Sequence, residues 1–352
     1  MRLRELLREV GRNLLTGTTR VGTWAVLFLL LVGGLAAADV RTIVEIDAGA
    51  HAFREAGGAV QVLGAPGQID GRRCEALAHL DGVTAVGALR VADPVTLAAL
   101  PSFPVPVHEV TAGLPAVLGV VGDVVGVAIP HPLAETLGTG AGLARLSEGM
   151  VPIGAVYRYP EDGRATALGH TVLAPVPTTG GFDACWAEIW PTDAATSQTL
   201  RYALIDGADA ASVTQRQLNS TLGQEYDTAA LLDGRLTRWV PGVAALAGVL
   251  LAAGSVRRRR LELASARHAG VAAASLTLQT VVETVTWAAA ATVIALPMLW
   301  WVAVEGNPGE PWPVWVLGVA TVLVGALATV PAAAATCLLT RERHLFRYFK
   351  DH

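Results

Sequence analysis

The chain has 352 residues, 52% of them hydrophobic, and a formal net charge of −4. Its three cysteines show no paired Cys/His spacing, so the sequence gives no support for a zinc site. Between Asp39 and Arg238 there are 22 acidic and 12 basic residues, and this acidity argues against binding to nucleic acid.

The first 20 residues carry an apolar stripe at helical spacing. The stripe consists of Leu3, Leu6, Leu7, Val10, Leu14 and Leu15. It predicts a cytoplasmic amphipathic helix over residues 1–20 that lies along the inner membrane surface. The apolar run 21–38 then predicts a first membrane span. A cleaved signal peptide is the alternative, because the run contains Ala36-Ala37-Ala38, but the 20 residues before it exceed a typical n-region.

Residues 39–239 are predicted to form one large extracytoplasmic α+β domain, inserted between the first and second spans. Short strand-like and helix-like segments alternate along it. The predicted strands are 59–63, 83–91, 152–157, 167–176, 187–190 and 200–205, and the predicted helices are 71–80 and 210–222. Asp70 is a candidate N-cap for the first of these helices. The Gly- and Pro-rich segment 101–148 is predicted to be a separate insert.

Two of the three cysteines, Cys74 and Cys185, fall in this domain. An extracytoplasmic compartment permits oxidation, so the pair forms a disulfide, which we favour, or remains as two free thiols. Trp186 and Trp190 lie beside Cys185. They form either an exposed binding face or, as is more usual at this spacing, part of the core.

Three further apolar runs, 240–256, 269–304 and 314–339, complete a set of four predicted spans. The segments 1–20, 257–268 and 340–352 hold 14 of the 26 basic residues, whereas the loop 305–313 holds none. Because arginine and lysine near span ends stay in the cytoplasm, both termini are predicted to be cytoplasmic and the loop to lie outside. Tryptophans at the outer span ends agree with this orientation: Trp239, Trp300, Trp301, Trp312 and Trp315. A single lysine against 25 arginines suggests a GC-rich bacterial source, and hence the plasma (inner) membrane.

The third run is unusual in length and in charge. As a helix its 36 residues would extend about 54 Å, against a hydrocarbon core of about 30 Å, so it is predicted to project into the cytoplasm or to bend near Pro297. Glu283 lies well inside this run, where a charge is costly. Either it makes a contact that changes with the state of the protein, or a hydrogen bond to Gln279, Thr280 or Thr284 merely satisfies it.

Signatures of catalysis are missing from the sequence. There is no Gly-x-x-x-x-Gly-Lys-Ser/Thr loop, and the only lysine is Lys350. The histidines of the inserted stretch are scattered, without His-Glu-x-x-His or Gly-x-Ser-x-Gly. We therefore predict a non-catalytic chain with no cofactor of its own, and a membrane-tethered hydrolase is the alternative.

The segment from Arg257 to Gly270 reads RRRRLELASARHAG and opens into the third span. The spacing of Glu262, Arg267 and Gly270 in it resembles the cytoplasmic motif of FtsX/MacB/LolC-type permease subunits of ABC transporters. The layout of the whole chain is also similar to that family, with one span, a large outer domain and then three spans. Arg12-Asn13, Glu283 and Pro331-Ala332 resemble family positions, whereas Ala269 and the alanines 333–335 depart from the family pattern.

The resemblance implies that residues 257–268 form a coupling helix, which receives the movement of a separate cytoplasmic ATPase subunit that binds ATP and Mg. The residues implied in this contact are Arg257, Arg258, Arg259, Arg260, Glu262, Arg267 and Gly270. The arginines can also pair with anionic membrane lipid, and the alternative is that they only set the topology. A second permease, either a copy or a relative, is implied as well. The expected function is export or extraction of a peptide, lipid or amphiphilic compound. The alternative is regulation of an extracytoplasmic partner, such as a cell-wall hydrolase, without transport.

Overall fold

The computed structural model describes Arg12 and residues 20–97, 100–138, 140, 142–146, 149–192 and 194–340. The chain divides into two compact units, a helical unit (residues 1–49 with 228–352) and an inserted domain (residues 50–227). Apart from Arg12 and Arg20, the predicted amphipathic helix 1–20 lies outside the described residues, as does the predicted tail beyond Thr340.

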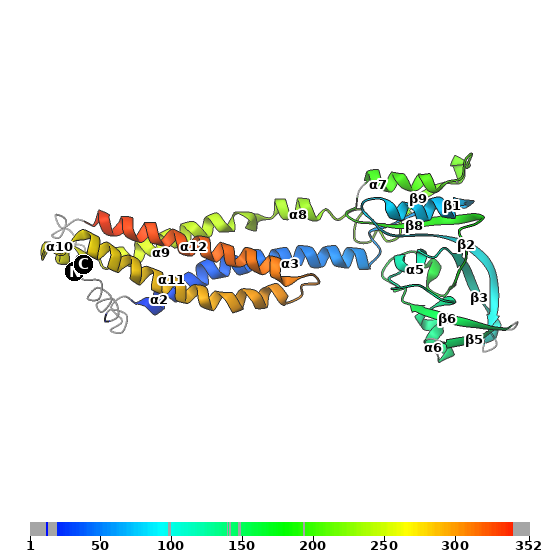
Figure 1. The fold of residues 1–352 in the computed structure, drawn as a ribbon, viewed down its shortest axis with the longest axis horizontal. Coiled ribbons are helices and arrows are strands. Elements are labelled where there is room, and N and C mark those ends of the chain that lie inside the picture. The colour runs from blue at the N-terminus through cyan, green and yellow to red at the C-terminus, as the bar shows by residue number, and fades with distance from the viewer. Residues whose placement is uncertain are drawn as a thin grey trace. The chain divides into compact units, whose positions relative to one another are not determined.

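Within the described part of the chain, four helices are long and apolar enough to cross a membrane (Figure 1). The first joins α2 (Val21–Phe28), a π-helical turn (Leu29–Gly33) and α3 (Gly34–Glu55), and the others are α9 (Val240–Arg258), α11 (Ala273–Val304) and α12 (Pro311–Leu339). A helix suits such segments because it satisfies every backbone polar group internally, as lipid requires. The predicted class, four spanning helices with an α+β domain between the first and second, is confirmed.

The first helix and the inserted domain have different bounds from those predicted. The helix does not end at residue 38 but continues to Glu55, and the inserted domain begins at Ala50 instead of residue 39. The cause is that residues 39–55 retain helix-forming side chains although they are too polar for the middle of a membrane. A short helix α8 (Thr228–Gly234) and a 3₁₀ turn (Leu236–Trp239) precede α9.

The segment 257–268, predicted as one cytoplasmic helix, is broken at Arg259. Arg257 and Arg258 form the last turn of α9, and a separate helix α10 covers Arg260–His268. Gly270, at φ +85°, then adopts a backbone conformation that other residues rarely tolerate, and α11 begins at Ala273 instead of residue 269. α12 starts three residues earlier than the predicted span, at Pro311, since proline suits the first turn of a helix.

Small residues allow the spanning helices to approach closely. A Cβ atom added at Gly248 of α9 would lie 2.2 Å from the carbonyl oxygen of Gly325 on α12. α12 also packs against the first helix, where Val40 lies against Gly318 and Val32 lies against Gly325. The core of this unit is accordingly rich in alanine.

The inserted domain contains a sheet of nine strands in the order β3-β7-β4-β6-β5-β2-β8-β1-β9. The strands are β1 (Val60–Asp70), β2 (Val83–Leu97), β3 (Leu100–Val110), β4 (Val127–Pro130), β5 (Gly142–Leu146), β6 (Gly149–Tyr157), β7 (Val172–Pro175), β8 (Gly181–Ile189) and β9 (Thr214–Gln217). The helices are α4 (Gly71–Ala76), α5 (Leu114–Val117), α6 (His131–Leu137) and α7 (Ala194–Thr199). β8 lies antiparallel between β1 and β2 (Figure 1), so β1, α4 and β2 form a split βαβ unit.

The other half of the sheet closes on itself. The long strand β2 pairs with β8 through its first residues and with β3 and β5 further along. Because β3 continues through β7, β4 and β6 to β5, these six strands form a ring. The predicted separate insert 101–148 is therefore wrong: it supplies β3, β4 and β5 to this ring, and three of its prolines, Pro101, Pro104 and Pro106, lie within β3 itself.

Two predicted elements near the end of the domain are also wrong. Residues 200–205 contain a 3₁₀ turn (Leu200–Ala203) instead of a strand, and the predicted helix 210–222 is replaced by a 3₁₀ turn (Ala210–Ser212) and β9. β9 forms because β1 offers it a free edge, with Gln61 opposite Gln217. Local sequence carries no sign of that distant partner.

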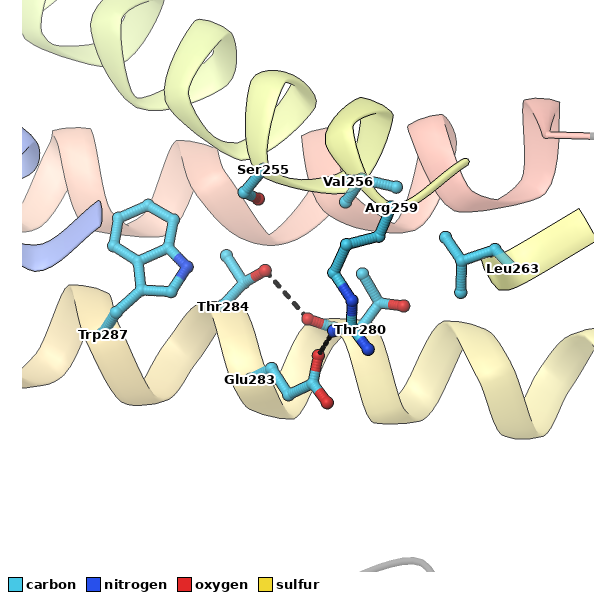
Figure 2. Close-up of a pocket in the computed structure, with 8 residues that line it drawn as sticks. All are labelled: Ser255, Val256, Arg259, Leu263, Thr280, Glu283, Thr284 and Trp287. Atoms are coloured by element: carbon cyan, nitrogen blue, oxygen red, sulfur yellow. Dashed lines mark hydrogen bonds and ion pairs between the residues drawn. The ribbon is translucent and has the colours of Figure 1, made fainter. Parts of the chain in front are cut away.

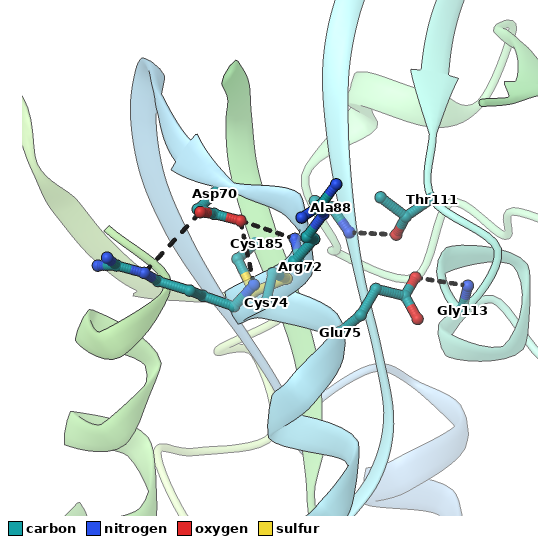
Figure 3. The surroundings of a disulfide bond; sticks show 9 residues. Asp70, Arg72, Cys74, Glu75, Ala88, Thr111, Gly113 and Cys185 are labelled. Atoms are coloured by element: carbon teal, nitrogen blue, oxygen red, sulfur yellow. Dashed lines mark hydrogen bonds and ion pairs between the residues drawn. A yellow bond between two sulfur atoms is a disulfide. The ribbon is translucent and has the colours of Figure 1, made fainter. Parts of the chain in front are cut away.

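The core of the split βαβ unit surrounds a disulfide between Cys74 of α4 and Cys185 of β8 (Figure 3). The side chain of Asp70 caps α4 by accepting hydrogen bonds from the backbone N–H groups of Arg72 and Arg73, at 2.8 and 3.2 Å. Trp186 is buried in the neighbouring cluster, as the core interpretation expects. Trp190 is only partly buried, with its ring 6.3 Å from that of Phe53.

Candidate functional site

The most distinctive polar site of the helical unit lies where α9, α10 and α11 meet. α10 has Glu262 in its first turn and Arg267 and His268 in its last turn. This arrangement stabilises the helix, because each charge interacts favourably with the helix dipole. Leu263 and Ala264 are buried, and Leu263 belongs to a cluster with residues of α9, α11 and α12. Glu262, Ser265 and His268 form the exposed face of the same helix.

Arg259, at the break between α9 and α10, connects two helices through two carboxylates, and Figure 2 shows its contact with Glu283. Its Nε donates a hydrogen bond to Glu262 on α10 at 2.8 Å, and its Nη1 donates to Glu283 on α11. The Glu283 side chain is only 6% exposed, and Gln279 donates to its second carboxylate oxygen at 3.3 Å. The guanidinium thus reaches from the end of α9 to a charge buried in a spanning helix.

Charge and burial act on Arg259 in opposite directions. Burial by itself lowers the pKa of this guanidinium, but the carboxylates of Glu283 and Glu262 outweigh it, so that the pKa is raised above its ordinary value. The arginine therefore stays charged. A small pocket surrounds the pair, lined by Ser255, Val256, Arg259, Leu263, Thr280, Glu283, Thr284 and Trp287 (Figure 2). Removing either member of such a buried pair would leave the other charge without its partner.

The C-terminal end of α10 is attached to a different spanning helix. Arg267 donates hydrogen bonds from Nη1 to the carbonyl oxygen of Thr340 at 2.6 Å and from Nη2 to that of Cys337 at 3.1 Å. These carbonyls belong to the end of α12, where a helix has unpaired acceptors and partial negative charge. α10 is consequently fixed to α11 through Arg259 and to α12 through Arg267.

The structure separates the predicted site residues into three groups. Arg259, Glu262, Gln279 and Glu283 come together in one network. Arg267 binds α12 instead, while Arg257 and Arg258 are exposed on the last turn of α9, Arg260 is partly buried in α10, and Gly270 is exposed. The hydroxyls of Thr280 and Thr284 donate to carbonyls of their own helix, at 2.8 Å each, and not to Glu283.

Sequence reasoning missed the partner of Glu283 and the attachment to α12. The sequence groups Arg259 with its neighbouring arginines, and nothing in the local pattern distinguishes it from them. The spacing of Thr280, Glu283, Thr284 and Trp287, which repeats by three and four residues, could have shown that they share one face of α11. No sequence signal marks the carbonyl acceptors at the end of α12.

The inserted domain has a polar cluster of its own at its first and last residues. Arg164 donates to the carboxylate of Asp162 at 2.6 Å and to the carbonyl oxygen of Glu55, at the end of α3, at 2.7 Å. The buried Asn219 donates to the carbonyl oxygens of Ala56 and Asp162, at 3.0 and 3.1 Å. These bonds join the end of α3 to the chain segment that leaves the domain.

No protein-family model matches the chain, and no curated protein matches it by sequence. Solved structures do resemble it. One is the periplasmic region of MacB from Actinobacillus actinomycetemcomitans, with 8% identity over 47% of this chain and 91% of that one, and a TM-score of 0.34. Another is the extracellular domain of the noncanonic ABC-type transporter YknZ from Gram-positive bacteria, with 14% identity over 45% of this chain and 100% of that one, and a TM-score of 0.33. Similarity at this level does not establish a shared activity.

Proposed function

We propose that this chain is the permease subunit of an ATP-driven ABC transporter of the FtsX/MacB/LolC type. The observation that carries the proposal is the attachment of α10 at both of its ends, through Arg259 to Glu283 and through Arg267 to α12. A short polar helix fixed in this way passes any displacement to two spanning helices. A segment whose arginines only set the membrane topology would not need either contact.

A separate ATPase subunit, which binds ATP and Mg, would supply the displacement. The exposed face of α10, with Glu262 and His268, and the exposed Arg257 and Arg258 offer this partner a mixed-charge surface in the cytoplasm. The buried face keeps α10 on the spans. Two permeases, both copies of this chain or one copy with a relative, would stand beside two ATPases.

We further propose that the movement serves to export or extract a peptide, lipid or amphiphilic compound. Regulation of an extracytoplasmic partner without transport is the second candidate. A compound that stimulates ATP hydrolysis would support export, and a bound hydrolase or lipoprotein would support regulation.

The test is purification of the tagged chain from its native membrane in mild detergent, followed by mass spectrometry and an ATPase assay. We expect an ATP-binding subunit to accompany the chain. Glu262→Arg should weaken that association, because it alters the exposed face of α10. Glu283→Gln should leave the association intact but reduce ATP hydrolysis about tenfold, because α10 loses its charged attachment to α11.

Glu310→Gln is the matched control, since Glu310 is exposed and directly precedes the first residue of α12, at the end of α12 opposite to the one that Arg267 contacts. It should behave like the unmodified chain. If no ATP-binding subunit accompanies the chain, the proposed function is wrong. If the subunit is present but Glu283→Gln hydrolyses ATP as fast as Glu310→Gln does, the proposed role of the Arg259–Glu283 contact is wrong.

A further inference from the structure

A cleft of about 850 Å³ lies wholly within the inserted domain. Its walls come from the last turn of α3, from α5 and the turn that follows it, from the start of α6 and from the end of β6. Cavities of this size commonly hold a small organic ligand.

The cleft is enriched in cationic side chains although its domain is acidic. Residues 50–227 contain 9 arginines and 18 carboxylates. Three of these arginines, Arg54, Arg158 and Arg164, line the cleft, but only two of the carboxylates do, Glu55 and Glu188. The cleft therefore concentrates guanidinium groups, which suit carboxylates and phosphates, in a domain that is otherwise acidic.

Only one of the three arginines has its charge available. Arg54 pairs with Glu188 at 2.9 Å, and Arg164 pairs with Asp162 at 2.6 Å. Arg158 is exposed and has neither a hydrogen-bond nor an ion-pair partner among the described residues. Its planar guanidinium can therefore receive a carboxylate or a phosphate through two hydrogen bonds.

The remaining wall of the cleft is apolar or neutral. Val117, Leu118 and Leu218 line it. Tyr159 also lines it, and its hydroxyl donates to the carbonyl oxygen of Ala165. Burial raises the pKa of Tyr159 to about 12, so its ring stays neutral at physiological pH and does not repel an anion.

We propose that this cleft binds an organic anion, with a carboxylate or phosphate on Arg158 and a short apolar chain against Val117 and Leu118. The site requires only residues of the inserted domain. It is independent of the ATPase and therefore of the function proposed above.

The test uses the full chain in phosphatidylcholine nanodiscs, without any ATPase, and isothermal titration with empty nanodiscs as the reference. The anionic probes are octyl phosphate and octanoate, and the comparison probes are 1-octanol and inorganic phosphate. We expect both octyl anions to bind more tightly than either comparison probe. Binding of only one of them would still support the site and would identify the anionic group it prefers.

Substitutions then locate the site. Arg158→Gln should weaken binding of the octyl anions about tenfold, and Arg158→Lys should weaken it less. Arg72→Gln, which removes an exposed arginine outside the cleft, should leave it unchanged. The inference is overturned if neither anion binds, if 1-octanol binds equally well, or if Arg158→Gln binds as tightly as the unmodified chain. Because Arg158 is exposed, its replacement leaves the core of the domain intact.

Discussion

The buried core of the helical unit is richer in small residues than that of the inserted domain, although it also contains Phe28, Trp287 and Leu299. In the helical unit alanines such as Ala244 and Ala291 line the contacts, and Gly248 meets the backbone at Gly325. In the inserted domain the fully buried positions include larger side chains such as Leu63, Ile69 and Phe182. Burial of a large apolar side chain stabilises a fold surrounded by water, but it gains little when the alternative surrounding is lipid. Close backbone approach therefore takes its place in the helical unit.

The largest expected effect comes from removing the covalent link of the inserted domain. Cys74→Ala with Cys185→Ala opens a closed loop of 111 residues, which should lower the free energy of unfolding of the domain by about 4 kcal/mol. Hydrogen exchange of the full chain in nanodiscs should then show amides of β1 and β8 exchanging about a thousandfold faster, with α9 and α12 unchanged.

Cys337→Ala provides the comparison, because this free cysteine is buried in the helical unit. It should leave β1 and β8 protected as before. Equal exchange rates in β1 and β8 with and without the disulfide would show that the sheet does not depend on the link.

The next largest effect should come from the helical unit. Gly248→Ala places a methyl group against the carbonyl of Gly325 and forces α9 away from α12, at a cost of about 3 kcal/mol. Gly242→Ala lies on the same helix with nothing within 4 Å of the added Cβ, and it should be neutral or slightly stabilising. The two variants are compared by the temperature at which each, heated in detergent, no longer elutes as a single monodisperse species. Similar behaviour of both would argue against close α9 and α12 packing.

The smallest effect concerns an ion pair of the inserted domain. Hydrogen bonds from Arg164 hold the pKa of Asp162 below its usual value, although burial acts in the opposite direction. Because the folded pKa is the lower one, the pair stabilises the domain above the unfolded value of about 4, and this contribution is lost as pH falls through the folded pKa. Asp162→Asn should therefore cost about 1 kcal/mol at neutral pH. The difference should shrink as the pH falls below about 4.

This difference is measured by urea unfolding of the full chain in nanodiscs at several pH values. Hydrogen exchange of the amides of β6 serves as the readout. Asp206→Asn serves as control, because the Asp206 side chain is 91% exposed in its pair with Arg73. Exposed pairs contribute little, so this variant should resemble the unmodified chain. A loss of stability that does not change with pH would contradict the ionic origin of the Asp162 effect.

Local sequence was sufficient for several elements of the inserted domain. The predicted strand 83–91 lies within β2, the predicted helix 71–80 corresponds to α4 and a following 3₁₀ turn, and Asp70 caps α4 as expected. Alternating apolar residues and a capping side chain are local properties, so they can be read from neighbouring positions. Residues 210–222 could not be predicted in this way, since β9 owes its conformation to the edge of β1.

The candidate site shows the same division. An acidic residue inside an apolar run identified Glu283, and an arginine-rich segment identified the neighbourhood of α10. Neither pattern could distinguish Arg259 from the three arginines next to it. The backbone break at Arg259 decides which guanidinium turns toward α11, and the end of α12 decides what Arg267 binds.

The sequence by itself determined the four apolar helices and the class of domain inserted among them, because hydrophobic length and periodicity are properties of consecutive residues. It also indicated where charge is costly. Only the tertiary structure decided which charges meet, how six strands close into a ring, and that Arg158 remains available in its cleft. Those outcomes depend on groups that are far apart in the chain, and folding alone sets the distances between them.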